Sequence, residues 1–398
     1  EIKSNKIDLT KIKYNFFLKI FSYLDYEDIV KVSSINKKYK ILCDDPYLTI
    51  RREFICFYTK QSFENTILGY GINVLFHRGS DTIKSIKPVL DLLSIDAYNE
   101  NNIRISVWNE EFRFWLPINI NSKHVNNAKN IIETNISNIY FSRYNDIEYK
   151  NKILKENNFK PKFLLDILCK LMSSMIVDMF KEDIFISTKA LNGFCEFHHL
   201  LIKFILWYPE IIDIANEKIY NFINTEGFTR KNKIPSLGDF LILLLVTNKY
   251  EWNDIKEKYK KESIDRNVMW VLKDINDLNE IKDANEIFEI VKIGKRLFLF
   301  TIYFINNVAP FCKHTYDKRY GRPPKEIEED FQNKIKKINN INTWEEYYKE
   351  LGIYKSPNSK IIYEYKIACN SSSQKRYHKI TKNPRSLESE DIVSYWRR

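Results

Sequence analysis

Glycine is scarce in this chain, because only 9 of its 398 residues are glycine, about a third of the usual ~7%. β-Propellers, small barrels and folds with glycine-rich phosphate loops need glycine at tight turns and wherever the backbone approaches a phosphate. Neither the G-x-G-x-x-G nor the G-x-x-x-x-G-K-[ST] motif occurs in the sequence. These classes of protein are therefore not expected.

Cysteine is also sparse, and its six positions are far apart. No two cysteines form a C-x-x-C pair, so neither a RING-type zinc site nor a disulfide scaffold is predicted. The sequence opens without a charged-then-apolar leader, and its longest apolar stretches, 241–246 and 297–305, are far shorter than the ~20 residues of a bilayer span. We expect a reduced chain in the cytoplasm or nucleus that needs no membrane, metal or cofactor.

Positive charge exceeds negative charge, with 63 Lys and Arg against 52 Asp and Glu and a formal net charge of +11. The basic residues are spread through the chain, whereas a nucleic-acid-binding protein gathers them on one face. Nucleic acid is therefore not the expected partner, although a basic helical nucleic-acid-binding protein remains an alternative. The segment in which basic residues are densest, 316–325, carries Lys318, Arg319, Arg322 and Lys325. It could contact phosphate or an acidic partner, although an exposed linker is the simpler interpretation.

Helical periodicity begins near the N-terminus. Apolar residues recur at steps of three and four over 11–24, which predicts a helix with one buried stripe. A second short helix is expected over 27–32, and a third is expected to start at a cap on Ser34. Asp45 and Pro46 predict the start of a fourth helix that runs through Phe57.

Beyond Pro161 the pattern predicts a large helical domain. Thr343 and Glu346 form a capping box at the start of its last predicted helix, and Gly352 ends that helix. From Ser356 the sequence is polar and predicts a tail. The other predicted helices cover 163–180, 188–207, 211–223, 237–246, 252–259, 268–272, 287–308 and 327–338.

A β insert is expected before this helical domain. Apolar and polar residues alternate over 103–120, which predicts a small hairpin that turns near Asn109 and Glu110. Gly69, Gly71 and Gly79 lie close together and mark a candidate boundary. The fold class is therefore mainly α, with a three-helix unit at 9–58, a mixed connecting region at 59–160 that holds the β insert, an irregular helical domain at 161–355 and a polar tail at 356–398.

The segment 12–54 resembles an F-box, the short module by which substrate receptors dock on the Skp adaptor of cullin ubiquitin ligases. Residues 18–25 (LKIFSYLD) look like the signature of the first helix of this family, and residues 26–30 (YEDIV) fit the acid-then-aliphatic start of its second helix. Residues 33–39 (SSINKKY) and 44–48 (DDPYL) match its later pattern. The family usually opens with Leu-Pro, where this chain has Ile12 and Lys13, and often closes with Trp, where this chain has Thr49.

These helices carry more apolar side chains than one small core needs, so some must face a partner or the downstream domain. The resemblance implies that the partner is the Skp adaptor of a cullin ligase complex, that an unknown target protein is held by the helical domain, and that the chain is not an enzyme. A helical scaffold that self-associates without a ligase link remains an alternative. The expected adaptor-binding residues are Ile12, Phe16, Leu18, Ile20, Leu24, Ile29, Val32, Ile35, Tyr39 and Leu42.

Two further clusters are candidates for function. Cys195 and His199 are four residues apart on one expected helix face, which is the spacing of a metal pair. No third ligand can be identified, and an activity based on Cys195 is not expected. Trp108, Phe112, Phe114 and Trp115 concentrate aromatic mass on the predicted hairpin. Aromatic residues so spaced usually form core, but they also anchor binding surfaces, so these four are candidate target-binding residues.

Overall fold

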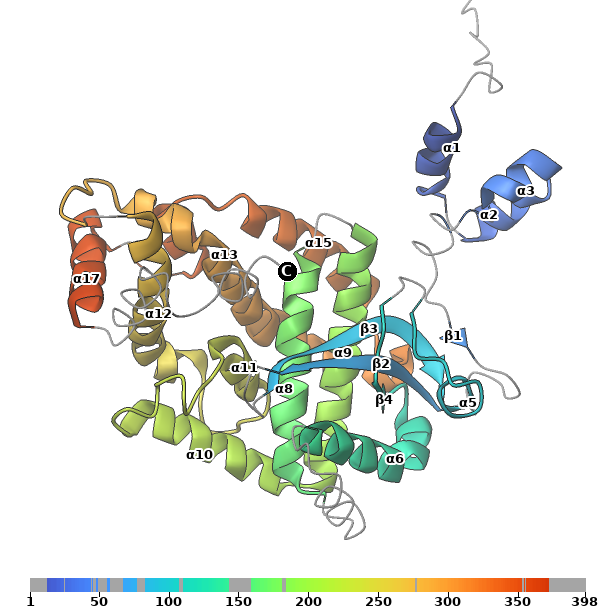
Figure 1. Cartoon of the computed structure of the whole chain (residues 1–398), viewed down its shortest axis with the longest axis horizontal. Coiled ribbons are helices and arrows are strands. Elements are labelled where there is room, and N and C mark those ends of the chain that lie inside the picture. The colour runs from blue at the N-terminus through green and yellow to red at the C-terminus, as the bar shows by residue number, and fades with distance from the viewer. Residues whose placement is uncertain are drawn as a thin grey trace, which may run out of the picture. The chain divides into compact units, whose positions relative to one another are not determined.

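Figure 1 shows a computed structural model of the chain, which consists of two compact units. One unit comprises 1–159 with 181–196, and the other comprises 160–180 with 197–398. The described part of the chain is mainly helical with a small sheet, as the sequence predicts. The structure describes residues 13–24, 26–43, 45, 48, 56–57, 67–76, 83–106, 110–142, 159–180, 184–275, 278–352, 354 and 356–371.

Three short helices follow one another near the N-terminus, as expected. They are α1 (Tyr14–Phe21), α2 (Tyr26–Ser33) and α3 (Lys37–Cys43). They enclose a core of their own, in which the rings of Phe17, Phe21 and Tyr39 lie 5.8 to 6.0 Å apart. The cap of α3 differs from the prediction, because the Asn36 side chain accepts the Tyr39 N–H at 2.9 Å, whereas the Ser34 hydroxyl donates back to the Lys31 carbonyl.

The predicted fourth helix does not extend to Phe57. Cys56–Phe57 form strand β1, which pairs in parallel with Leu92 and Leu93 of strand β3. Most residues between Asp45 and Cys56 lie outside the described part of the chain. The prediction was wrong at its C-terminal end because pairing with a distant strand decides the conformation of so short a segment.

The sheet has the strand order β1-β3-β2-β4, and β2 pairs antiparallel with both of its neighbours. Helix α6 packs against β4 in the same unit. The long strands β2 and β3, as well as α6, were not predicted from the sequence. The bounds are β2 (Leu68–Phe76), β3 (Ile83–Ser94), α5 (Ile95–Asn99), β4 (Phe114–Pro117) and α6 (Ser122–Phe141).

The predicted hairpin over 103–120 is only partly present. Ile105 and Glu111 form an isolated antiparallel bridge, and residues 107–109 lie outside the described part of the chain. The second arm, β4, pairs with β2 instead of the first arm. The β insert is therefore larger than expected and includes Gly69 and Gly71, two of the glycines that the sequence suggested as a boundary, whereas Gly79 lies outside the described residues.

Gly69 and Gly71 are packing positions within β2. A Cβ atom on Gly69 would lie closer than 3.0 Å to the Leu116 carbonyl, and one on Gly71 would lie equally close to the Phe112 ring. Absence of a side chain therefore allows β4 and the Phe112 ring to approach β2.

We expect the substitution Gly69→Ala to destabilise the sheet unit by about 1 to 3 kcal/mol, because backbone atoms cannot move aside as a flexible side chain can. Chemical denaturation followed by circular dichroism measures this loss. The control is Gly294→Ala in a helix, where an added Cβ meets nothing within 4 Å and should stabilise by up to about 1 kcal/mol. Equal stability of the Gly69→Ala variant and the wild type would contradict this packing role.

His124 joins α6 to the sheet. Its Nε2 atom accepts a hydrogen bond from the Leu68 N–H at 2.8 Å. Burial lowers the pKa of His124 to about 4. The folded protein therefore holds a neutral imidazole that accepts a backbone hydrogen bond.

This lowered pKa predicts a loss of stability in mild acid. The unfolded chain takes up a proton on His124 near its ordinary pKa of 6.5, whereas the folded chain does so only near 4, so stability falls as the pH falls through that window and levels off below it. Between about pH 7 and about pH 5 the loss from this group is about 2 kcal/mol. Unfolding of the wild type and of His124→Gln at both pH values tests this, and an equal pH dependence of the two would contradict it.

The second unit is built of helices that match most of the predicted segments. The capping box of Thr343 and Glu346 is present, and Gly352 has a φ of 68° after the helix that it ends. Helix α9 contributes residues to both units. The bounds are α8 (Pro161–Met179), α9 (Ile184–Trp207), α10 (Glu210–Asn224), α11 (Leu237–Ile242), η2 (Leu243–Leu245), α12 (Trp252–Asp274), α13 (Ala284–Tyr303), η3 (Phe304–Val308), α14 (Ala309–Cys312), η4 (Tyr316–Arg319), α15 (Lys325–Asn339), α16 (Trp344–Glu350) and α17 (Asn358–Ser371).

Two predictions for this unit need correction. The segments 252–259 and 268–272 are parts of one helix, α12, because Lys260, Lys261, Glu262 and Arg266 between them are good helix formers. The start of the expected polar tail is helix α17, which packs against α12 and α13. Ile361, Ile362 and Tyr365 are buried at helical spacing and supply the apolar stripe.

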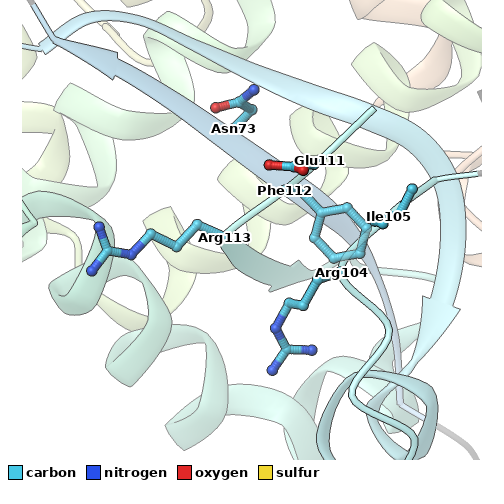
Figure 2. A pocket seen from close by; sticks show the side chains of 6 residues that line it. All are labelled: Asn73, Arg104, Ile105, Glu111, Phe112 and Arg113. Atoms are coloured by element: carbon cyan, nitrogen blue, oxygen red, sulfur yellow. The ribbon is translucent and has the colours of Figure 1, made fainter. Parts of the chain in front are cut away.

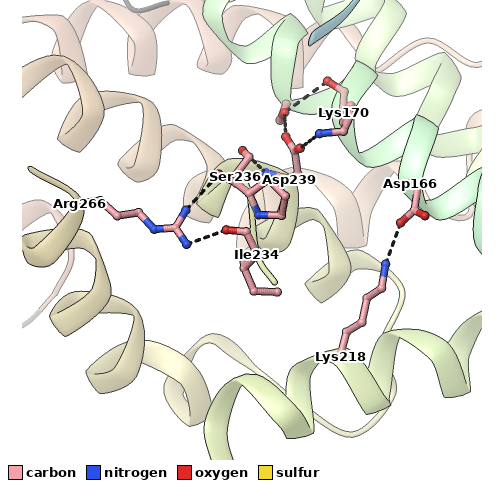
Figure 3. Close-up of polar contacts among 9 residues, drawn as sticks. Asp166, Lys170, Lys218, Ile234, Ser236, Asp239 and Arg266 are labelled. Atoms are coloured by element: carbon pink, nitrogen blue, oxygen red, sulfur yellow. Dashed lines mark hydrogen bonds and ion pairs between the residues drawn. The ribbon is translucent and has the colours of Figure 1, made fainter. Parts of the chain in front are cut away.

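Ion pairs and hydrogen bonds join the helices of this unit (Figure 3). Lys170 of α8 contacts Asp239 of α11 at 3.0 Å, and Lys218 of α10 contacts Asp166 of α8 at 2.8 Å. Arg266 of α12 donates to the carbonyl oxygens of 229, 234 and 235 at 2.7 to 3.2 Å. The hydrogen bonds of Arg266 fix the loop before α11 against α12, and the two ion pairs join α8 to α11 and α10.

Candidate functional site

The three N-terminal helices bury one set of apolar side chains and expose another. Phe16 and Ile20 are four residues apart on α1 and share a face, where 65% and 44% of their surfaces are exposed. Ile35, in the turn before α3, is 63% exposed. Exposed apolar side chains on so small a unit are a candidate protein-binding surface.

The other expected adaptor-binding residues are placed differently. Leu18, Ile29 and Leu42 are buried in the core of the three helices, so they support the surface from within and are not open to a partner. Leu24, Val32 and Tyr39 are partly buried against that core. Ile12 lies outside the described residues.

Sequence reasoning missed three exposed large hydrophobic residues of the N-terminal three-helix segment, Tyr14, Tyr23 and Ile41. Ile41 directly precedes the buried Leu42. Because both residues are apolar, the sequence alone does not show which of the two is exposed. The Tyr14 hydroxyl donates to the Asp45 carboxylate at 2.5 Å and joins the start of α1 to the residue beyond α3. This hydrogen bond raises the pKa of Tyr14.

Comparison with protein families identifies the three N-terminal helices. Residues 15–51 match the family model of the F-box domain. They are an F-box domain. F-box domains bind the Skp adaptor in cullin ligase complexes, and the domain suggests the role of a substrate receptor in an SCF-type ubiquitin ligase. F-box proteins are typically non-catalytic adaptors and generally work inside the cell.

The match covers a small part of the chain, and no family is named for the rest of it. Neither the curated proteins nor the solved structures contain a match to this chain. In the described residues, no helix is both long and apolar enough to cross a bilayer. The part of the chain beyond the F-box domain must therefore be interpreted from its own residues.

Two of the four aromatic residues expected to bind a target are core residues. Phe112 and Trp115 are buried among apolar side chains of β3 and α5, and the Trp115 indole donates to the Leu93 carbonyl at 3.3 Å. Phe114 is half-buried, and Trp108 lies outside the described residues. Trp115 in particular is not available to a partner, because its ring fills the space between the sheet and α5.

One open pocket lies beside these residues, with a volume of about 530 Å³ (Figure 2). Phe112 forms part of its wall, together with Asn73, Ile105 and Glu111. Arg104 and Arg113 also line the pocket. The Arg104 guanidinium donates a hydrogen bond to the Tyr98 carbonyl at 2.6 Å and lies over the Tyr98 ring. The pocket thus mixes charges of both signs and specifies no single ligand chemistry.

The cluster that could have supported catalysis is buried. The Cys195 side chain is completely inaccessible, and His198 and His199 are nearly so. Burial lowers the pKa of His198 to about 3, so this imidazole is neutral. In the described part of the chain, no three His, Cys, Asp or Glu side chains gather as a metal site requires.

We expect the Cys195 thiol to resist iodoacetamide in the native protein, because alkylation needs an accessible thiolate. Mass spectrometry of the native protein and of protein unfolded in guanidinium measures the modification, which should appear quickly only after unfolding. Cys195→Ala should cost about 1 kcal/mol of stability. Rapid alkylation of native Cys195 at about pH 6, well below the ordinary thiol pKa, would instead show a reactive thiolate.

Proposed function

We propose that this chain is a substrate receptor of an SCF-type ubiquitin ligase that docks on the Skp adaptor through Phe16, Ile20 and Ile35. The F-box match carries this proposal. Exposure of these three side chains on a unit that already has its own core supports it. Covering them in a complex removes apolar surface from water, which stabilises the complex by about 25 cal/mol for each Å² buried.

The rest of the chain would present the target protein to the ligase, in the cytoplasm or nucleus. The expected organisation into a docking unit at 9–58, a connecting region at 59–160 and a helical body at 161–355 fits this division of roles. The chain would act by positioning a target and would not catalyse a reaction itself.

The docking surface can be tested with the double substitution Phe16→Asp and Ile20→Asp. Both side chains are exposed, so the unit should stay folded, whereas two carboxylates buried at the adaptor contact should weaken binding at least about a hundredfold. Calorimetry with a purified Skp adaptor measures the affinity. Circular dichroism checks that the helices persist.

A matched control replaces two exposed aliphatic residues elsewhere. Leu206 and Ile293 are 70% and 53% exposed on α9 and α13, so Leu206→Asp with Ile293→Asp introduces the same charges away from the F-box domain. This control should bind the adaptor like the wild type. Normal adaptor binding by the folded Phe16→Asp, Ile20→Asp variant, or no binding by the wild type, would contradict the proposed docking surface.

A further inference from the structure

The end of α14 and the segment that follows it, which includes η4, concentrate exposed positive charge. We call residues 311–322 the basic loop. Lys313, Lys318, Arg319 and Arg322 are all exposed, and Asp317 is the loop's one acidic residue. Within the described part of the chain, Lys313, Lys318 and Arg319 take part in no ion pair. Their charges are therefore available to a ligand.

The basic loop is anchored to the helical unit by two histidines of α9. Tyr316 is buried, and its hydroxyl lies 2.9 Å from Nδ1 of His198. The His199 ring stacks on the Tyr316 ring with 5.0 Å between the centroids, and its Nε2 atom lies 3.0 Å from an oxygen of Asp317. These contacts hold the middle of the loop, so the exposed cations project from a fixed base.

The backbone of the basic loop has a specified shape. Tyr320 and Gly321 both have left-handed conformations, with φ of 55° and 83°. The Gly321 N–H donates to the Tyr316 carbonyl, and the Arg322 N–H donates to the Arg319 carbonyl, both at 3.0 Å. The left-handed conformation is unfavourable for a tyrosine, and residues held in such strained conformations cluster at functional sites. The Tyr320 side chain is exposed, as is that of Phe311, so apolar surface adjoins the positive charge.

The positive surface is short. Lys325, at the start of α15, is the last basic residue before Glu326, Glu328, Glu329 and Asp330. These acidic residues limit the basic region to the loop and Lys325. Nucleic-acid-binding surfaces need a longer basic track that follows successive phosphates. A short acidic peptide needs only a few cations with neighbouring apolar contacts, so the charge pattern favours a protein ligand.

We propose that the basic loop binds an acidic peptide segment of the target protein, with Lys318 and Arg319 as its main charged contacts. This inference rests on the proposed function for the assignment of that segment to a ligase target. Phe311 and Tyr320 contact apolar side chains of the same segment. The two histidines of α9 act as positioning residues for the loop.

The test uses fluorescence anisotropy of the full chain with a fluorescein-labelled, glutamate-rich octapeptide that contains one leucine. Charge reversal in the variant Lys318→Glu, Arg319→Glu should weaken binding at least about tenfold, since two attractive contacts become repulsive. The uncharged variant Lys318→Gln, Arg319→Gln should weaken it less. Binding by the wild type should also decrease with added salt.

A matched control reverses two exposed lysines of α12, in the variant Lys258→Glu, Lys261→Glu, which changes the net charge by the same amount. This control should bind the peptide like the wild type. Equal weakening by both reversals would show only a net-charge effect and overturn the proposal. Tighter binding of a single-stranded RNA octamer than of the peptide, lost on reversal at 318 and 319, would assign the loop to nucleic acid and also overturn it.

Adaptor binding separates this inference from the proposed function. The loop variants should bind the Skp adaptor normally, because the F-box domain is unchanged. Absence of peptide binding by a wild-type chain that binds the adaptor would overturn the inference about the loop alone. Peptide binding that depends on Lys318 and Arg319, in a chain that does not bind the adaptor, would overturn the proposed function alone.

Discussion

A module of three short helices can bury only one side of each helix, and this constraint shapes the functional surface of the chain. Phe17, Leu18 and Phe21 occupy the inner side of α1, which leaves Phe16 and Ile20 on its outer side. The residues that form the core of the module therefore also determine which side of α1 faces outward. Because the outer side chains are apolar, water favours a state in which a partner covers them.

The histidines illustrate how residues suited to catalysis serve as structural supports. His124 accepts a backbone hydrogen bond from β2, and His198 contacts the Tyr316 hydroxyl. Burial disfavours the charged form of both imidazoles and lowers their pKa values. A neutral, buried imidazole with a fixed hydrogen bond positions its neighbours, and in the second unit those neighbours belong to the basic loop.

The β insert shows the limit of pattern reasoning. Alternation over 103–120 indicated extended structure, which the described residues form at β4 and at the bridge between Ile105 and Glu111. It could not show that β4 pairs with a strand that starts at Leu68. Gly69 and Gly71 looked like a boundary because glycine usually marks turns. Their actual role depends on the approach of the Leu116 carbonyl and the Phe112 ring, which only the folded sheet brings about.

The sequence by itself determined the helical class, most helices of the second unit and the capping box at Thr343, because local periodicity and capping chemistry act over a few residues. The F-box domain was found in the sequence by the resemblance of residues 12–54 to that family, and the family model matches residues 15–51. Tertiary structure decided which side chains of each apolar set are exposed. It exposed Phe16, Ile20 and Ile35 while burying Leu18, Ile29 and Leu42. It also brought His198 and His199 of α9 to Tyr316 and Asp317. These outcomes depend on contacts between residues far apart in the chain, which no local pattern encodes.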